Sequence, residues 1–131
     1  MIDHIGFAVS DLSAARAFYE RALAPLGILV LMDVTEQMTG GHGAHTGFGK
    51  DGKPFFWIGT GKTASGSAHV AFVAPDRATV DEFHRAAVAA GGRDNGAPGL
   101  RPEYHPDYYG AFVLDPDGNN IEAVNHGGAA E

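Results

Sequence analysis

The sequence of 131 residues contains no cysteine, and its nine Lys and Arg residues are outnumbered by sixteen Asp and Glu residues. Without cysteine there is no disulfide framework, no thiolate ligand and no cysteine nucleophile, so any metal ion must be held by His, Asp or Glu. The formal net charge is −7 and the basic residues are scattered along the chain. Binding to a phosphate backbone needs clustered Lys and Arg, so nucleic acid is not an expected partner.

Long apolar runs are also missing. No segment approaches the roughly 20 apolar residues that a membrane helix needs, so we expect no transmembrane segment. The chain runs from Met1 straight into a strand-like stretch without the basic start and apolar core of a signal peptide, which predicts a cytoplasmic protein.

A repeat is the most informative feature that is present. The segment from Asp3 to Asp11 recurs, with conservative changes, from Ala68 to Asp76, and His4 falls on His69, an offset of 69 minus 4, or 65 residues. Two copies of about 60 residues are too small to bury a core alone. We therefore expect one domain over 1–131, built from a module over about 1–60, a linker over about 60–67 and a second module over about 67–126.

Each module is predicted to contain one helix among several strands. The first module is expected to contain a strand over 2–9, a helix capped by Asp11 or Ser13 and stopped by Gly27, a strand over 28–34, a glycine-rich loop over 40–49 with at most one weak strand, and a strand over 54–58. The helix positions expected to face inward are Ala14, Ala17, Phe18, Ala22 and Leu26.

The second module begins in the same way and ends in a hairpin. Its expected elements are a strand over 67–74, a helix over 77–90, an irregular stretch over 93–107, a strand over 109–114, a turn over 115–118 and a strand over 119–124. The helix positions expected to face inward are Val80, Phe83, Ala87 and Val88. The tail over 127–131 is expected to fray.

A carboxylate stands in the middle of the last apolar strand, Ile121-Glu122-Ala123-Val124. An unpaired buried charge there would cost several kcal/mol, so Glu122 needs a partner. His4 and His69 begin equivalent strands, and two imidazoles with one carboxylate suit a divalent first-row metal with open positions for substrate. The alternative is that each is an ordinary core or surface residue, but the matched positions of the two histidines favour the triad.

These motifs together resemble the vicinal oxygen chelate superfamily, which includes glyoxalase I, extradiol dioxygenases, fosfomycin-resistance transferases and bleomycin-resistance proteins. The similarity covers essentially the whole chain, and its most specific part is Asp115-Pro116-Asp117-Gly118-Asn119 followed by Glu122. It implies an α+β fold of tandem β-α-β-β-β modules that form a curled mixed sheet around a metal-binding cleft. It also implies His4, His69 and Glu122 as metal ligands and a homodimer, in some members with exchanged modules.

One departure from the family pattern concerns a fourth ligand. Glyoxalase I enzymes generally have one on the last strand of the other module, and aligning Asp51-Gly52 with Asp117-Gly118 assigns that place to Phe56, with Trp57 adjacent. Neither side chain binds metal, so three ligands are expected unless Glu36 or Gln37 reaches in. Fosfomycin transferases also carry several basic residues that bind the phosphonate group. Here only Arg93 and Arg101 are available for that role, so the similarity to these transferases is weak.

Candidate acid and base groups lie in the segment 104–109, which the resemblance puts at the edge of the cleft. We single out Tyr104, His105 and Tyr109, together with Glu122, as candidate catalytic residues. The alternative is that these aromatic residues cover the mouth of the cleft or pack in a dimer interface. The remaining histidines are expected to be structural or solvated: His42, His45, His84 and His126.

The sequence thus predicts a metal-dependent enzyme of the lyase or dioxygenase type. It would bind Fe²⁺, Mn²⁺, Zn²⁺ or Ni²⁺ and hold two neighbouring oxygens of a small-molecule substrate. The rival hypothesis is a metal-free, drug-sequestering protein of the bleomycin-resistance type, in which Phe55, Phe56 and Trp57 would stack on a flat or cationic ligand.

Overall fold

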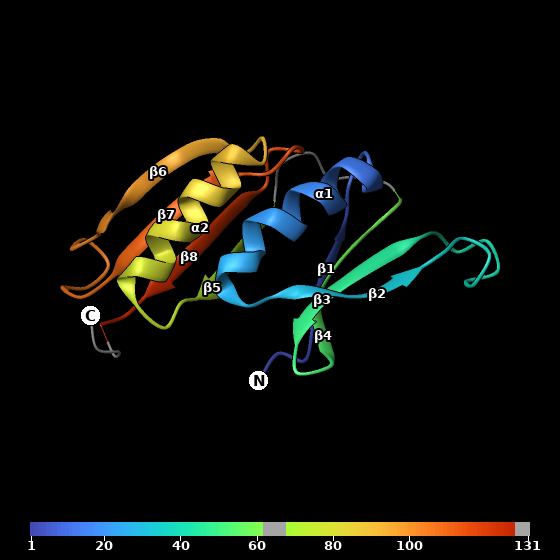
Figure 1. The fold of residues 1–131 in the computed structure, drawn as a ribbon, viewed down its shortest axis with the longest axis horizontal. Coiled ribbons are helices and arrows are strands. Elements are labelled where there is room, and N and C mark those ends of the chain that lie inside the picture. The colour runs from blue at the N-terminus through green and yellow to red at the C-terminus, as the bar shows by residue number, and fades with distance from the viewer. Residues whose placement is uncertain (62–67, 128–131) are drawn as a thin grey trace.

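The computed structural model describes residues 1–61 and 68–127, and each half of this chain has the order β-α-β-β-β (Figure 1). The first half contains β1 (Ile5–Ala8), α1 (Leu12–Leu23), a short 3₁₀ turn (Ala24–Leu26), β2 (Leu29–Val34), β3 (His45–Lys50) and β4 (Lys53–Gly59). The second contains β5 (His69–Val73), α2 (Arg77–Ala89), β6 (Arg93–Leu100), β7 (Tyr109–Leu114) and β8 (Asn120–Asn125). Most of the expected linker, and the tail from 128, lie outside the described residues.

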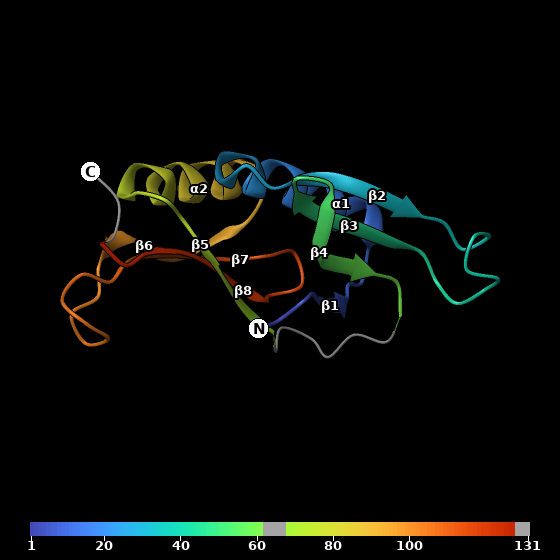
Figure 2. The ribbon, with the colours of Figure 1, turned by 90° about the horizontal axis from the view of Figure 1, so that it is seen from below.

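The strands form two four-stranded mixed sheets of the same topology. The strand orders are β1-β4-β3-β2 and β5-β8-β7-β6, and in each sheet the first strand of the module pairs in parallel with the last. The two helices lie side by side against one face of the sheets, and the opposite faces are left uncovered (Figure 2). The predicted α+β architecture of tandem modules is confirmed, and the sheets do not close into a barrel.

The two helices begin and end largely where the sequence predicts. Asp11 caps α1 by accepting a hydrogen bond from the Ala14 amide at 3.1 Å, and Gly27 ends the following turn with a φ of 75°. Asp76 caps α2 through Thr79 in the same way. These polar caps satisfy amides that the first turn of a helix leaves without a partner.

The predicted inward faces are partly wrong. In α1 the buried positions are Ala15, Phe18, Tyr19, Ala22 and Leu23, whereas Ala14 and Ala17 are exposed. The apolar pattern left out Tyr19, whose large ring is fully buried, so the buried face of α1 is centred closer to Tyr19 than expected. In α2, Val88 is 40% exposed although Val80, Phe83 and Ala87 are buried.

The stretch 93–107 was expected to be irregular, but its first part forms β6 on the edge of the second sheet. Glycine and proline disfavour a strand, yet β6 pairs with β7 and absorbs them through two register shifts around Gly96. β3, which lies between β2 and β4 in the first sheet, is also a full strand where at most a weak one was expected. Strand pairing has therefore overridden local propensity at both places.

One apolar core extends through both modules. The Phe56 and Phe72 rings, one from each sheet, pack edge-to-face at 5.3 Å, and the Tyr19 hydroxyl donates a hydrogen bond to Asp115 of the last hairpin at 2.5 Å. Burial raises the pKa of Tyr19 well above its usual value, so the phenol keeps its proton and remains a donor. These contacts fix the two halves against each other.

Candidate functional site

A histidine and a carboxylate meet on the uncovered face of the second sheet. His69 begins β5 and Glu122 lies on the adjacent parallel strand β8, with Nε2 of His69 3.0 Å from Oε1 of Glu122. The Glu122 side chain is 1% exposed, whereas the His69 side chain is 54% exposed. The structure therefore brings together two of the three predicted metal ligands, and the imidazole faces the open side.

The second oxygen of Glu122 is also engaged. The Tyr108 hydroxyl donates a hydrogen bond to Oε2 of Glu122. Burial and this hydrogen bond raise the pKa of Tyr108, so its phenol stays protonated. Gly110 makes the contact possible, because a Cβ there would lie 3.2 Å from both Oε2 of Glu122 and the Tyr108 ring.

Sequence reasoning missed Tyr108 and chose its neighbours. The signal lies in the strand register, which the structure supplies: Phe112 is paired with Glu122 across β7 and β8, and side chains alternate between faces. Counting back by twos from Phe112 passes Gly110 and reaches Tyr108. Tyr109 points to the other side, where its hydroxyl donates to Asp81 of α2 at 2.6 Å and the Arg77 guanidinium lies over its ring.

Tyr104 and His105 reach the carboxylate only through Tyr108. The Tyr104 and His105 rings pack edge-on against Tyr108, with centroids 4.9 and 5.4 Å away. Nε2 of His105 also lies 2.8 Å from Nδ1 of His126, and the two imidazoles are stacked. These residues form a layer behind Tyr108 that can hold its position.

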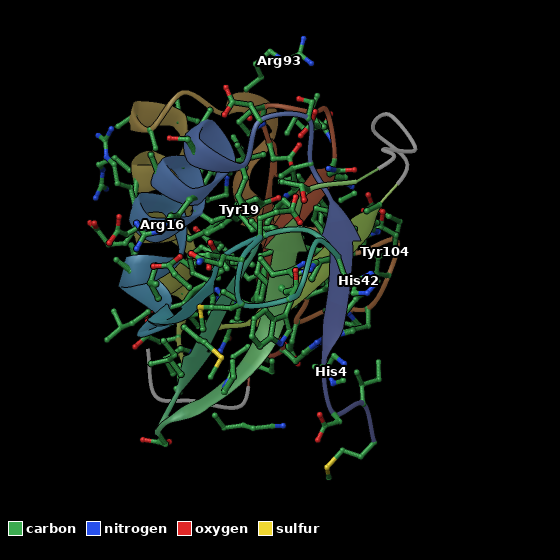
Figure 3. The ribbon with its side chains drawn as sticks, turned by 90° about the vertical axis from the view of Figure 1, so that its right-hand side faces the viewer. His4, Arg16, Tyr19, His42, Arg93 and Tyr104 are labelled. Carbon is green, nitrogen blue, oxygen red and sulfur yellow. The ribbon has the colours of Figure 1, made fainter. Side chains whose placement is uncertain are left out.

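His4, the third predicted ligand, lies just before β1 on the other module. Figure 3 shows it at the end of the segment that leads into β1, away from the buried Tyr19. Its Nδ1 lies 2.8 Å from Asp3, whose carboxylate also binds Lys53. If Nδ1 donates to this carboxylate, Nε2 carries the lone pair and is the nitrogen that can bind metal.

The three predicted ligands are not brought together in the described part of one chain. Among residues 1–61 and 68–127, no three His, Asp or Glu side chains lie close enough together to hold a metal ion. His4 and His69 do border the same hollow of about 480 Å³, which lies along the edge strand β5. The site is therefore a His69–Glu122 pair on one sheet, with His4 facing the open space next to the other.

The strand registers change which residue occupies the position where glyoxalase I enzymes generally have a fourth ligand. Glu122 pairs with Ala71, two residues after His69, and the matching residue two after His4 is Gly6, which pairs with Trp57. Trp57, not Phe56, is therefore the counterpart of Glu122. Phe56 is fully buried in the core. Glu36 lies in the turn after β2, where it accepts a hydrogen bond from the Gly43 amide.

Trp57 lines a hollow of about 620 Å³ on the uncovered face of the first sheet. Its lining includes His4 just before β1, His45 from β3 and Thr60 after β4. His45 was expected to be structural or solvated, and the structure places it beside this hollow. His84, by contrast, pairs with Asp94 at 3.0 Å on the helix side.

The two arginines considered for a phosphonate do not form a set. Arg101 donates to the carbonyls of Ala97 and Gly99, and its guanidinium lies over the Phe112 ring at 5.4 Å. Arg93 extends from the far end of β6 (Figure 3). These bonds tie the Arg101 side chain back to β6 and leave it beside a small hollow of about 290 Å³.

The fold and this site define a paired-module protein with a histidine–carboxylate pair on an open sheet face. The chain belongs to the Glyoxalase/Bleomycin resistance protein/Dioxygenase superfamily, whose family model matches residues 1–123. The resemblance predicted from the sequence is thereby confirmed. A search of curated proteins finds no match. No helix in the described part of the chain is long and apolar enough to cross a membrane.

Solved structures of the same superfamily are similar over nearly the whole chain. A glyoxalase/bleomycin resistance protein from Albidiferax ferrireducens is 28% identical with a TM-score of 0.77, over 95% of this chain and 98% of that one. A glyoxalase I mutant from Zea mays is 24% identical with a TM-score of 0.70, over 94% of this chain and 46% of that one. The fosfomycin resistance protein FosX from Listeria monocytogenes, whose structure was determined with Mn(II), is 18% identical with a TM-score of 0.67. The match covers 95% of this chain and 88% of that one. The last two likenesses concern the fold alone.

Proposed function

We propose that this protein is a divalent-metal-dependent enzyme that holds two neighbouring oxygens of a small substrate. The observation that carries the proposal is the His69–Glu122 pair, in which a buried carboxylate and an open imidazole lie 3.0 Å apart on adjacent parallel strands. Histidine and carboxylate ligands suit Fe²⁺, Mn²⁺, Zn²⁺ and Ni²⁺. The matched His4 supplies the third ligand.

The geometry of this pair fits a metal ion. Two ligand atoms bound at a right angle to one ion, with bonds of about 2.1 Å, stand about 3 Å apart. Glu122 is almost fully buried, and its ion-pair partner is a histidine and not a permanent cation. A divalent ion would compensate a buried negative charge that is otherwise costly.

The protein's own residues would prepare this site. Tyr108 fixes one oxygen of Glu122 and leaves the other to face His69. Tyr104 and His105 hold the Tyr108 ring from behind, which reduces its freedom to turn away. A bound divalent ion would act as a Lewis acid that stabilises the negative charge developing on the substrate oxygens.

We also propose that the chain works as a homodimer. The edge strands β1 and β5 carry exposed apolar side chains, including Ile5 at 40% and Val73 at 71% exposure. Open apolar strand edges are sites for pairing with another chain. A second copy packed along these edges would bring another His4 toward the His69–Glu122 pair and complete the three ligands.

Metal content tests the proposal directly. Protein purified without chelator or affinity tag should contain near-stoichiometric Fe, Mn, Zn or Ni by elemental analysis. His69→Ala and Glu122→Gln should each lower metal affinity at least about tenfold, because each removes a ligand. Circular dichroism should show that both variants remain folded.

His84→Ala is the matched control, because His84 also pairs with a carboxylate but lies on the helix side. It should leave the metal content unchanged. If His69→Ala keeps its metal, or if the wild-type protein takes up none when all four metals are supplied, the metal-dependent assignment is wrong and the sequestering function is favoured.

A further inference from the structure

The uncovered face of the first sheet is built from glycine and two flat rings. Gly6 and Gly47 are both paired with Trp57 on neighbouring strands, and Gly59 is paired with His45. Paired residues in a sheet share a face, so these side chains lie together on the side opposite Phe56 and Ile58. The glycines leave a shallow shelf on which larger rings can rest.

The Trp57 indole lies flat on this shelf. A Cβ at Gly47 would be 2.8 to 2.9 Å from three atoms of the six-membered indole ring, so only a residue without a side chain fits beneath it. Similarly, a Cβ at Gly59 would lie 2.2 Å from Nδ1 of His45. One face of the indole is thus covered by backbone, and Trp57 borders the hollow of about 620 Å³.

We propose that this shelf is a stacking site that selects substrates carrying a planar aromatic ring next to the two oxygens. The free face of an indole prefers flat rings, because offset stacking matches their quadrupoles and buries apolar area. His4 lines the same hollow, so a ligand held through its oxygens near His4 would have its ring within the Trp57 hollow. The part of the inference that concerns the oxygens rests on the proposed metal-dependent function.

The position of Trp57 strengthens this assignment. It occupies in the first module the place that Glu122 occupies in the second. One module thereby presents a carboxylate with an imidazole, and the other presents an indole with glycines. The two uncovered faces differ in chemistry, so in the proposed dimer the first sheet of one copy would recognise the apolar part of a ligand and the second sheet of the other copy would hold its oxygens.

The experiment uses two probes that share their oxygens and differ only in the ring: mandelate, which carries a phenyl group, and hexahydromandelate, which carries a cyclohexyl group. Trp57 is the one tryptophan of the chain, so fluorescence excited at its red edge reports this site alone. Mandelate should change the emission saturably and bind about fivefold more tightly than hexahydromandelate. Free N-acetyltryptophanamide, which has no binding site, should show only linear quenching.

Variants separate stacking from general binding, with affinities measured by calorimetry. Trp57→Leu should abolish the preference for mandelate, whereas Trp57→Phe should keep most of it. Gly47→Ala should weaken the preference because the added methyl group displaces the indole, and thermal melting checks that each variant is folded. The inference is overturned if mandelate gives no saturable signal, if wild-type protein binds both probes equally, or if Trp57→Leu keeps the preference.

Each titration is run on metal-loaded and on chelator-treated protein. Loss of affinity for both probes on metal removal supports the function proposed for the His69–Glu122 side. An aromatic preference that survives metal removal supports the Trp57 shelf even if the metal-dependent function fails. Metal-dependent binding without any ring preference would leave that function standing and reject the shelf.

Discussion

The carboxylate of Glu122 is buried, and each of its oxygens faces a different partner, His69 on one side and Tyr108 on the other. This division explains why a charge is tolerated in an otherwise apolar strand. The phenol supplies a permanent donor, because its pKa is raised by burial and by the negative charge beside it. The imidazole lies 3.0 Å from the remaining oxygen, and the proposed metal ion would bind between these two groups.

The raised pKa values of Tyr19 and Tyr108 predict a late step in the alkaline titration of the protein. Both groups are shifted upward, so each contributes stability that is present below the unfolded pKa, near 10, and is lost as the pH rises through the folded pKa. Phenolate absorbance at 295 nm should therefore continue to rise well above pH 10. Tyr108→Phe should remove part of the late step.

The stability of the Tyr108→Phe variant should also fall less steeply above pH 10 than that of the wild type. Denaturant unfolding at pH 8 and at pH 11 measures this difference. Identical pH dependence in the two proteins would mean that the Tyr108 phenol is not held by Glu122. Tyr104→Phe removes an exposed hydroxyl and is the matched control.

The prediction of single residues succeeded where the repeat matched two strands, and it failed where the result depended on which face of a strand a side chain occupies. His69 and Glu122 could be paired from the sequence, because matched strands start at matched histidines. The choice of Tyr109 in place of Tyr108, and of Phe56 in place of Trp57, are both errors of one position. In a strand, one position reverses the face, and the pairing register was not available before the structure.

Among the elements, the turn between β7 and β8 has a structural role that its motif does not reveal. Asp115 accepts hydrogen bonds from the amides of Asp117 and Asn119 and from the Asn119 side chain, in addition to the Tyr19 hydroxyl. The Asp117 carboxylate accepts from the Ser10 amide at 3.1 Å. The most specific piece of the family motif thus joins the last hairpin to α1 and the loop before it.

This contact between elements can be measured with a double-mutant cycle. Tyr19→Phe should destabilise the protein by about 1–3 kcal/mol, because it removes one donor from a buried carboxylate. In an Asp115→Asn background the same change should cost less, with a coupling energy of about 1 kcal/mol or more. Urea unfolding of the four proteins gives these values. Full additivity would show that the hydroxyl and the carboxylate do not interact.

The elements themselves follow from the sequence where capping and periodicity are strong. Each helix follows an Asp whose side chain accepts a hydrogen bond from the backbone amide three residues later. This capping pattern is visible in the sequence. β6 could not be predicted, because Arg93-Asp94-Asn95-Gly96-Ala97-Pro98-Gly99 carries almost no strand propensity. It becomes a strand because β7 offers a pairing partner along its length.

At the scale of the whole molecule, the open edges of the two sheets predict self-association. Sedimentation equilibrium should give twice the chain mass of 13.7 kDa. Val73→Asp should weaken the dimer at least about tenfold, because it places a charge in a buried contact. Since Val73 is 71% exposed in the single chain, folding of the monomer should change by about 0.5 kcal/mol or less.

Leu100→Asp is the matched control, since Leu100 is 48% exposed on β6, the opposite edge of the same sheet. It should leave association unchanged. A wild-type protein that stays monomeric at all concentrations, or a Leu100 variant that dissociates equally, would contradict the proposed use of the β5 edge.

The pairing of Gly6 with Trp57, set beside the pairing of Ala71 with Glu122, has a consequence for how this scaffold can be changed. The two sheets have the same strand topology, but their uncovered faces carry different side chains. The residues on the uncovered face of one sheet can therefore be substituted while those on the other sheet stay unchanged. A library confined to Trp57, His45 and the glycines beneath them would vary ligand preference and leave the His69–Glu122 pair intact, which makes the duplicated frame a natural starting point for redesign.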